Sequence, residues 1–529
     1  MSSPILSARK SSPQMSGNGT LICVPIMGDS VDRVINDIIK AKDAGADLVE
    51  VRLDFFNSPI NDPRSILSSI ISSSVLPTLF TYRPTWEGGR YDGDEEERLN
   101  VLLLATELGA KFIDIELKAA GELVDSIIAK KPSTCKVIIS SHNYENTPSI
   151  EVLGDLVAKI QAAGADIVKI ATTAVDISDV ARIFHIMVHC QVPIISMAMG
   201  ERGVISRILS AKFGGFLTFG ILENSQSSAP GQPTIKDLLE LYNFRSIGPD
   251  TRVHGILGNP VSHSKSPVLY NPSFKSLNYN GVFVHLLVDD LPSFLDTFSS
   301  LDFCGFSCTI PHKETALKCC DVVDPVAKII GAVNCLVRDK KDGKLYGYNT
   351  DYVGAITAIE DGLLRVSPKA ATGGSPLAGK TFVVIGAGGA GKALAYGAKE
   401  KGAKVIIANR TYERAKELGD LIGGEAIRLS ELKDMKEEDG MILANSTSIG
   451  MHPNVDETPI PMEALKRYAL VFDAVYTPKM TRLLIEAEQS GCAVVTGLEM
   501  FIGQAHEQFE RFTSLPAPKE LFKSIMSKF

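Results

Sequence analysis

Residues 44–52 read Ala-Gly-Ala-Asp-Leu-Val-Glu-Val-Arg, and residues 163–170 repeat the arrangement as Ala-Gly-Ala-Asp-Ile-Val-Lys-Ile. In both stretches a Gly closes a segment of helical periodicity and an apolar run follows at once. The runs are rich in Val, Ile and Leu without alternation, which is typical of strands buried on both faces. The repeat therefore predicts alternating helices and parallel strands.

Eight such runs follow one another from residue 20, and eight β/α units in about 225 residues predict a (β/α)8 barrel. An open doubly wound sheet is the alternative. Ile235–Phe244 is expected to be the helix that closes the barrel. The eight runs are Leu21–Met27, Leu48–Leu53, Pro77–Tyr82, Phe112–Leu117, Lys136–Ser140, Ile167–Ile170, Pro193–Met197 and Phe216–Ile221.

The rest of the chain is predicted to hold a short linker and two further β/α series, which begin at Val253 and Thr381. We therefore predict an α/β protein in which a (β/α)8 barrel precedes a two-lobed half with an α/β substrate lobe and a Rossmann lobe. The expected regions are a disordered tail at 1–19, the barrel at 20–245, the linker at 246–252, the substrate lobe at 253–353 plus 498–529, and the Rossmann lobe at 354–497.

Composition excludes several classes of protein. The net charge of −8 argues against a general nucleic-acid or anionic-membrane surface, and no apolar run reaches the roughly 18 residues of a membrane helix. The nine cysteines are scattered without zinc-site spacing, so we expect buried thiols in a reducing compartment and no metal. Residues 1–19 are rich in Ser and carry basic residues, as a disordered tail or the remnant of a transit peptide would.

The C-terminal ends of the barrel strands carry the first candidate site, because barrel active sites lie at that face. A lysine at a strand end is ordinarily a solvated charge, but Lys169 stands in an apolar run. Desolvation and neighbouring arginines would favour the neutral amine that attacks a ketone. His142 ends the preceding strand and suits proton transfer near neutral pH. The ionisable strand-end residues are Glu50, Arg52, Arg83, Glu116, His142 and Lys169.

Arginines among these residues suit a carboxylate substrate, which they bind with two parallel hydrogen bonds. A structural ion pair between Glu50 and Arg52 is the alternative for those two residues. The segments Glu-Val-Arg-Leu-Asp at 50–54, Ser-His at 141–142 and Val-Lys-Ile at 168–170 resemble the type I 3-dehydroquinate dehydratase family, and Ser206-Arg207 and residues 228–232 extend the resemblance over 20–245.

That resemblance implies that Lys169 forms an imine with the substrate ketone. His142 would remove the neighbouring proton and then assist departure of the β-hydroxyl, while Glu116 would hold and polarise His142. Arg207 would bind the carboxylate. The ring hydroxyls would be read by Glu50, Arg52, Arg83, Ser228 and Gln232.

A dinucleotide site is predicted at residues 386–391, which match G-x-G-x-x-G between an apolar strand and a helical stretch. The next strand ends at Asn409-Arg410-Thr411, where an NAD site would place Asp or Glu. Arg410, with Arg414, suits the 2′-phosphate of NADP instead, and NADP(H) is the expected cofactor. The residues of the turn are Gly386, Ala387, Gly388, Gly389, Ala390 and Gly391.

The substrate lobe carries a Ser-rich loop with Ser264 and Ser266, for which simple helix capping is the alternative, and a Lys313/Asp351 pair suited to sharing a proton. These segments, with Asp-Ala-Val-Tyr-Thr-Pro at 473–478 and residues 497–504, resemble the shikimate dehydrogenase family over 250–529. Ser307 departs from the Asn of many bacterial relatives. The resemblance implies that Lys313 and Asp351 are catalytic, that Gly497 lies at the cofactor, and that hydroxyls are bound by Ser264, Ser266, Thr309, Asn334, Asp351, Tyr476 and Gln504.

Both halves in this order resemble the plant family of bifunctional 3-dehydroquinate dehydratase/shikimate dehydrogenases. The resemblance implies small-molecule substrates (3-dehydroquinate, 3-dehydroshikimate and shikimate), a monomer, and the plastid stroma, with the cytosol as the alternative because no full transit peptide is evident. A quinate dehydrogenase is the alternative from the same class; the resemblance implies that such an enzyme has lost the second serine of the Ser-Lys-Ser loop or changed the Thr309 position, and because Ser266 and Thr309 are intact shikimate is favoured. A silent regulatory homologue is disfavoured because Lys169, His142, Lys313 and Asp351 are all present.

Overall fold

The computed structural model describes residues 19–56, 60–119, 121–223, 229–366, 374–436, 438 and 440–528. The predicted tail, apart from Gly19, and the predicted site residue Ser228 lie outside these ranges. In the described part of the chain, none of the helices combines the length and apolarity needed to cross a membrane.

The chain divides into two compact units, and the boundaries predicted from the sequence stay predictions. The first unit is Met1–Gly255, Pro260–Pro267 and Phe274–Phe303, and the second is Ile256–Asn259, Val268–Ser273 and Cys304–Phe529.

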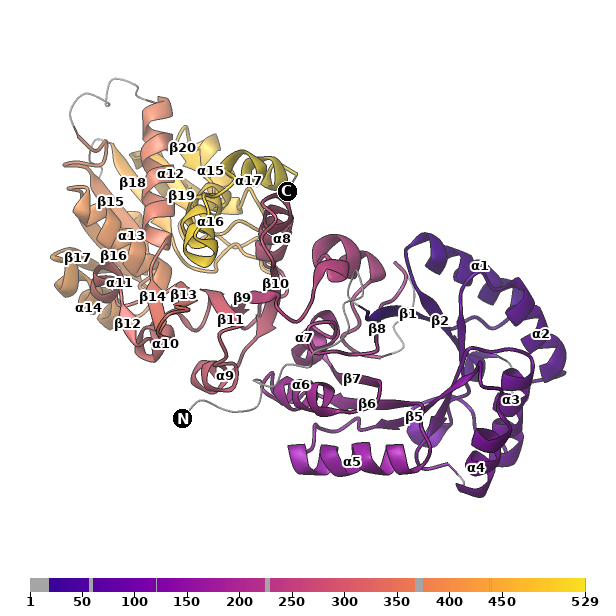
Figure 1. Ribbon diagram of the computed structural model, residues 1–529. Coiled ribbons are helices and arrows are strands. Elements are labelled where there is room, and N and C mark those ends of the chain that lie inside the picture. Colours follow the sequence, from indigo (N-terminus) through magenta and orange to yellow (C-terminus); the bar gives the residue numbers. More distant parts are fainter. Residues whose placement is uncertain are drawn as a thin grey trace. The chain divides into compact units, whose positions relative to one another are not determined.

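A parallel barrel of eight strands forms most of the first unit (Figure 1). The strands pair in the order β7-β6-β5-β4-β3-β2-β1-β8, and the Phe216 amide donates to the Ile194 carbonyl at 2.7 Å beside β8 and β7. This sequential order confirms the predicted barrel over the doubly wound sheet. The strands are β1 (Leu21–Ile26), β2 (Leu48–Arg52), β3 (Thr78–Thr81), β4 (Phe112–Glu116), β5 (Lys136–His142), β6 (Ile167–Thr173), β7 (Ile194–Met199) and β8 (Leu217–Phe219).

Helices cover the outside of the barrel strands (Figure 1). The segment predicted to close the barrel is helical, but it is wound as a π-helix over Asp237–Leu241. The α-helices are α1 (Val31–Asp43), α2 (Pro63–Ser73), α3 (Glu95–Glu107), α4 (Gly121–Lys130), α5 (Ile150–Ala162), α6 (Asp179–His189) and α7 (Val204–Ile208).

Strand periodicity places the ionisable residues inside the barrel. Ile167 and Ala171 of β6 belong to the apolar cluster that fills the interior. Because successive side chains of a strand point to opposite faces, Lys169 lies on the same inward face. The same period on β2 places Glu50 and Arg52 inward above Leu48, which also belongs to that cluster.

A six-stranded sheet comes next in the chain, with the order β10-β9-β11-β13-β14-β12. Its strands β11, β13 and β14 pair antiparallel. The strands are β9 (Arg252–Gly258), β10 (Gly281–Leu287), β11 (Phe303–Cys308), β12 (Val322–Val323), β13 (Cys335–Arg338) and β14 (Leu345–Tyr348). The helices are α8 (Ser266–Ser276), α9 (Leu291–Thr297), α10 (Lys313–Cys319) and α11 (Pro325–Ile330).

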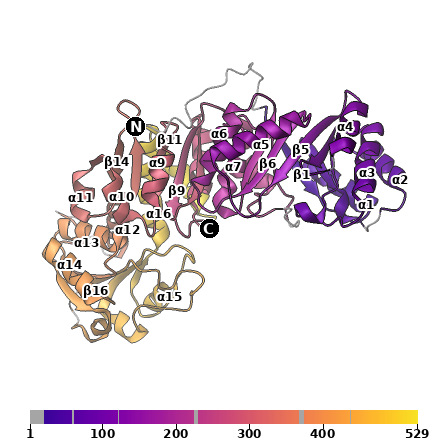
Figure 2. The same ribbon diagram turned by 90° about the horizontal axis from the view of Figure 1, so that it is seen from below.

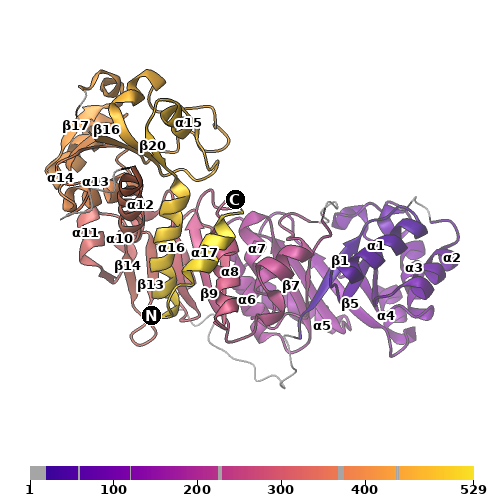
Figure 3. The same ribbon diagram turned by 90° about the horizontal axis from the view of Figure 1, so that it is seen from above.

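The last sheet is parallel, with the order β17-β16-β15-β18-β19-β20, and has a core on each face. Phe382 and Val384 of β15 pack into one core, whereas Val383 and Ile385 pack into the other. Figure 3 shows α12 and α16 against one another. The strands are β15 (Thr381–Ile385), β16 (Lys404–Asn409), β17 (Glu425–Arg428), β18 (Met441–Asn445), β19 (Tyr468–Asp473) and β20 (Ala493–Val495), and the helices are α12 (Asp351–Val366), α13 (Gly389–Glu400), α14 (Tyr412–Ile422), α15 (Arg482–Gln489), α16 (Gly497–Thr513) and α17 (Lys519–Met526).

Candidate active sites

A small cavity at the C-terminal ends of the barrel strands collects most of the predicted residues. Its volume is about 60 Å³, enough for small polar groups but tight around a ring. Met197, Phe219 and Tyr144 supply its apolar walls. The predicted residues that line it are Glu50, Arg52, Arg83, His142, Lys169, Arg207 and Gln232.

Lys169 is buried and held by carboxylates. Its Nζ lies 2.6 Å from Asp114 Oδ2 and 3.5 Å from Glu50 Oε1. From the sequence, neighbouring arginines were expected to favour the neutral form of the Lys169 amine, and Asp114 was not singled out. Burial alone would raise the pKa of Asp114, but Arg83 and Lys169 hold it well below its usual range. The resting lysine therefore faces a permanent anion, so the amine must be freed from this pair before it can react.

His142 is held by Glu87, which corrects the predicted role of Glu116. Glu87 Oε1 lies 3.3 Å from His142 Nδ1 and accepts the His142 backbone amide at 2.8 Å. Burial and the positive charge of Arg83 lower the pKa of His142 to about 4, although Glu87 acts in the opposite direction. His142 is therefore an uncharged base at neutral pH.

Glu116 has other partners in this structure. Its Oε1 accepts from Arg83 at 2.6 Å, and its Oε2 lies 2.8 Å from an Arg98 guanidinium that is fully buried. Arg83 also pairs with Asp114 at 3.0 Å. Glu116 thus fixes Arg83, and Arg83 fixes the carboxylate that holds Lys169.

The alternative of an ion pair between Glu50 and Arg52 is not what the structure has. Arg52 donates twice to Asp54, at 2.9 and 2.8 Å, and Glu50 accepts from the Thr81 hydroxyl at 2.8 Å. Glu50 therefore lines the cavity without an ion pair to Arg52.

Arg207 is the cation with spare hydrogen-bond donors. Its side chain is buried with 1% exposure, and its Nη1 contacts Met197 Sδ at 3.1 Å. Within the described residues, its Nε and Nη2 have no hydrogen-bond partner. Burial lowers the pKa of Arg207 to about 10. A buried guanidinium with free donors at a cavity fits a carboxylate, because two parallel hydrogen bonds would satisfy it.

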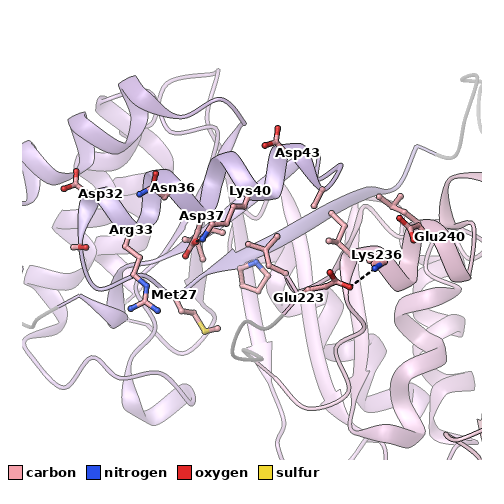
Figure 4. Close-up of a pocket in the computed structure, with 17 residues that line it drawn as sticks. Met27, Asp32, Arg33, Asn36, Asp37, Lys40, Asp43, Glu223, Lys236 and Glu240 are labelled. Atoms are coloured by element: carbon pink, nitrogen blue, oxygen red, sulfur yellow. Dashed lines mark hydrogen bonds and ion pairs between the residues drawn. The ribbon is translucent and has the colours of Figure 1, made fainter.

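A larger hollow of about 1160 Å³ lies on the flank of the barrel (Figure 4). Acidic and basic side chains of α1 alternate along it, and Lys236 pairs with Glu223 at 3.1 Å. Its lining adjoins residues 224–228, which the structure does not describe. Within the described ranges, no cluster of three or more His, Cys, Asp or Glu side chains could hold a metal ion.

Lys313 and Asp351 form the core of the second candidate site. Lys313 Nζ lies 2.5 Å from Asp351 Oδ2, and both side chains are largely buried. Lys313 begins α10 and Asp351 begins α12, so the two helix starts present the pair. The Asn349 side chain accepts the Asp351 amide at 3.1 Å, which fixes the start of α12.

A network of amide side chains adjoins this pair through Thr350, the residue before Asp351. Asn334 donates to Gln504 Oε1 at 3.3 Å and accepts the Thr350 amide at 2.7 Å. Gln508, which the sequence analysis missed, donates to Gln504 at 2.6 Å and accepts from Ser307. Gln508 stands one helical turn after Gln504 on α16, so its spacing was the available signal. Ser307 thus has a partner that suits its hydroxyl.

The remaining predicted hydroxyl contacts are each placed by a local neighbour. Ser264 Oγ lies 3.2 Å from Ser266 Oγ at the start of α8. The Ser264 carbonyl is 3.0 Å from His285 Nε2. Tyr476 stacks on Phe501 with 5.1 Å between ring centroids, and the Thr309 amide donates to the Leu257 carbonyl.

The glycine turn has the shape of a phosphate-binding site. Gly386 has a φ of +104°, which side-chain residues rarely adopt. A Cβ added to Gly391 would lie 2.2 Å from the Gly386 carbonyl oxygen, whereas one added to Gly388 would meet nothing within 4 Å. Gly388 precedes α13 without a side-chain cap. The turn therefore presents free backbone amides to open space, which fits a pyrophosphate. Ala387 and Ala390 lie in the same turn.

Gly389 lies against the second site. A Cβ there would fall 3.0 Å from Lys313 Cδ and 3.1 Å from Lys313 Cβ. Gly497, at the start of α16, is equally constrained, because a Cβ would lie 2.5 Å from the Ala474 carbonyl oxygen. The catalytic candidate Lys313 and the glycine turn are therefore in direct contact.

The end of β16 supplies the predicted 2′-phosphate residues. Arg410 and Thr411 are exposed, and Asn409 donates to the Thr411 carbonyl at 2.8 Å. Arg414, on the first turn of α14, pairs with Glu314 at 3.5 Å. The described part of the chain therefore has residues that suit the pyrophosphate and other residues that suit the 2′-phosphate.

Comparisons with known proteins divide the chain in the same way. Residues 22–249 match the family model described as type I 3-dehydroquinase. Residues 256–336 match the shikimate dehydrogenase substrate binding domain, and residues 369–473 match shikimate/quinate 5-dehydrogenase.

Whole proteins extend the match. The chloroplastic bifunctional 3-dehydroquinate dehydratase/shikimate dehydrogenase of Arabidopsis thaliana is 65% identical over 97% of this chain and 85% of its own length. The NADP(+) shikimate dehydrogenase of Bacillus cereus (strain AH187) is 36% identical over 52% of this chain and 97% of its own. A shikimate 5-dehydrogenase of Thermus thermophilus, solved with NADP(H) and shikimate, is 32% identical over 53% of this chain and 99% of its own, with a TM-score of 0.45. The chain therefore belongs to the family of bifunctional 3-dehydroquinate dehydratase/shikimate dehydrogenases.

Proposed function

We propose that the barrel dehydrates 3-dehydroquinate to 3-dehydroshikimate and that the second half reduces this product to shikimate with NADPH. The observation that supports the proposal most directly is that Lys169 and Arg207 line the same cavity. Among the described residues, Nε and Nη2 of Arg207 have no hydrogen-bond partner. An amine for a ketone and a cation for a carboxylate are what a keto acid requires.

Dehydration needs an electron sink and a base. Nitrogen of Lys169 would attack the ketone carbon and water would leave, forming an imine that makes the adjacent C–H acidic. Because Glu87 faces Nδ1 of His142, the Nδ1 proton would point to Glu87 and leave Nε2 free as the base. Nε2 would take the carbon-bound proton and return it to the departing hydroxyl, which leaves as water. Addition of a water to the imine would then release 3-dehydroshikimate and regenerate the Lys169 amine.

Reduction needs a proton donor at the carbonyl oxygen, and the bound NADPH would supply the hydride. Lys313 would give its proton to that oxygen, and Asp351 would keep the ammonium oriented at 2.5 Å. Asn334 and Gln504 would hold ring hydroxyls. Gly386, Gly388 and Gly391 would admit the pyrophosphate, and Arg410 with Arg414 would bind the 2′-phosphate.

The test is a coupled assay in which the intact chain is given 3-dehydroquinate and NADPH. Shikimate should form with one NADPH oxidised per molecule. Oxidation of shikimate should also exceed oxidation of quinate. If quinate is the better substrate, the second half is a quinate dehydrogenase and this part of the proposal fails.

The pH dependence of the dehydratase follows from His142. Its pKa is lowered to about 4, and a base must be uncharged to act, so activity is lost as the pH falls through that value. We expect kcat/KM for dehydration to stay level from about pH 8 to about pH 5 and to fall only below that, instead of near the usual histidine value of about 6.5. Circular dichroism at each pH controls for unfolding, and a decline centred near pH 6.5 would contradict the assignment.

Two neighbouring glycines should affect different kinetic constants of the reductase. Gly389→Ala would push on Lys313, and a misplacement of about 1 Å can cost about 100-fold, so kcat should fall. Gly388→Ala faces open space and should instead raise the KM for NADPH with kcat largely kept. Steady-state kinetics of 3-dehydroshikimate reduction, with the NADPH concentration varied, separate the two. Equal effects of both variants on KM alone would show that Gly389 does not act through Lys313.

We also propose that the chain acts in the plastid stroma. The support is the chloroplastic Arabidopsis relative.

A further inference from the structure

Glu314 is the residue next to Lys313 on α10, and it binds cations of two other helices. Its Oε1 lies 3.0 Å from Lys392 Nζ on α13 and 3.5 Å from an Arg414 guanidinium nitrogen on α14. Figure 2 shows α10, α13 and α14 gathered in one region. One carboxylate oxygen therefore serves both cations.

Both cations stand at the cofactor side of this region. Lys392 lies in the first turn of α13, and its amide donates to the carbonyl of Gly388 in the glycine turn at 2.8 Å. Arg414 lies five residues beyond the end of β16, where the sequence predicts the 2′-phosphate. All three side chains are partly exposed, from 23% to 54%, so an anion from solvent can reach them.

We propose that Glu314 is an internal competitor of the cofactor 2′-phosphate for Arg414, and this rests on the proposed role of Arg414. In the free enzyme the carboxylate holds the guanidinium in place. A 2′-phosphate carries about −1.5 to −2 charges at pH 7 and three acceptor oxygens, so it binds a guanidinium more strongly than one carboxylate and repels that carboxylate.

Two consequences follow from this exchange. Binding of a 2′-phosphate must overcome the Glu314–Arg414 pair, whereas a ligand without that phosphate leaves the pair intact. Glu314 therefore weakens the binding of the NADP type of cofactor specifically. Because Glu314 follows Lys313 on α10, the exchange also ties occupancy of the cofactor site to the helix that carries the catalytic lysine.

The test uses the cofactor-free, full-length chain and calorimetric titration with adenosine 2′-monophosphate and adenosine 5′-monophosphate. Exposed ion pairs contribute little, roughly 0.2–1 kcal/mol, which corresponds to about 1.4- to 5-fold in affinity. Glu314→Gln should therefore bind the 2′-monophosphate about two- to fivefold more tightly, with affinity for the 5′-monophosphate unchanged.

The matched control is Glu413→Gln, which removes the same charge from the residue beside Arg414. Within the described residues, Glu413 forms no ion pair with Arg414. If both variants bound the 2′-monophosphate more tightly by the same factor, the cause would be the loss of negative charge in general, and the proposal would be overturned. Unchanged or weaker binding of the 2′-monophosphate by Glu314→Gln would also overturn it.

Variants of Arg414 separate this inference from the function it rests on. Arg414→Gln alone should lose preference for the 2′-monophosphate, and if it does not, the proposed role of Arg414 fails. In Glu314→Gln/Arg414→Gln the gain seen in Glu314→Gln should vanish, because two residues in contact are coupled. A gain that persists without Arg414 would overturn the competition while leaving the proposed function intact.

Discussion

Lys169→Ala should abolish dehydration of 3-dehydroquinate, by at least about 10⁴-fold in kcat, because the nucleophile and its imine are lost together. Reduction of supplied 3-dehydroshikimate should continue at the wild-type rate. The variant is expected to fold, because Asp114 keeps its ion pair with Arg83 at 3.0 Å and is not left as an unpaired buried charge. NADPH oxidation with each substrate measures the two activities.

Chemical trapping identifies the residue directly. Borohydride added with 3-dehydroquinate should fix one adduct per wild-type chain on the peptide that contains Lys169, seen by mass spectrometry. Lys136→Ala, which removes a half-exposed lysine of β5, is the matched control and should trap normally. An undiminished adduct in Lys169→Ala would refute the assignment.

Lys313→Met should have the reverse pattern, with loss of reduction and normal dehydration. Removing a positioned proton donor costs about 10² to 10⁴ in rate, and we expect kcat to fall by about 10³. The KM for NADPH should change little, since the glycine turn and the arginines remain. Asp351→Asn should give a smaller loss, because the ammonium stays but is less well oriented.

The control for this pattern lies on the same helix. Lys318→Met removes an exposed charge from α10 without touching Asp351 and should leave kcat unchanged. Rapid-quench product analysis with 3-dehydroquinate should show 3-dehydroshikimate accumulating in Lys313→Met. Continued formation of shikimate at the wild-type rate would exclude Lys313 as the donor.

The barrel and its inward residues could be predicted because strand burial leaves a regular signal. All eight predicted runs are strands, and Lys169 lies between the inward residues Ile167 and Ala171. Asp114 could have been found in the same way, since Asp114 and Glu116 alternate with Ile113 and Ile115 and therefore share one face. Only the last residue of that strand was singled out, and the carboxylate that holds Lys169 was missed.

Glu87 could not be placed by such reasoning. It lies in a 3-10 turn, Thr85–Glu87, before a glycine at φ +80°, so no strand or helix period gives its direction. Its contact with His142 joins residues 55 positions apart. The pairing of Glu314 with Lys392 and Arg414 could not be predicted from the sequence either, because it depends on how three helices pack against one another.

The spare donors of Arg207 have a consequence for the lifetime of the folded barrel. Burial of a guanidinium without hydrogen-bond partners lowers the free energy of unfolding of the substrate-free protein. A carboxylate that supplies those partners recovers this stability, but only while it stays bound. Any ligand that prefers the folded state stabilises it by mass action, more strongly as its concentration exceeds its Kd. The resistance of this enzyme to unfolding and proteolysis would therefore rise and fall with the supply of its own substrate.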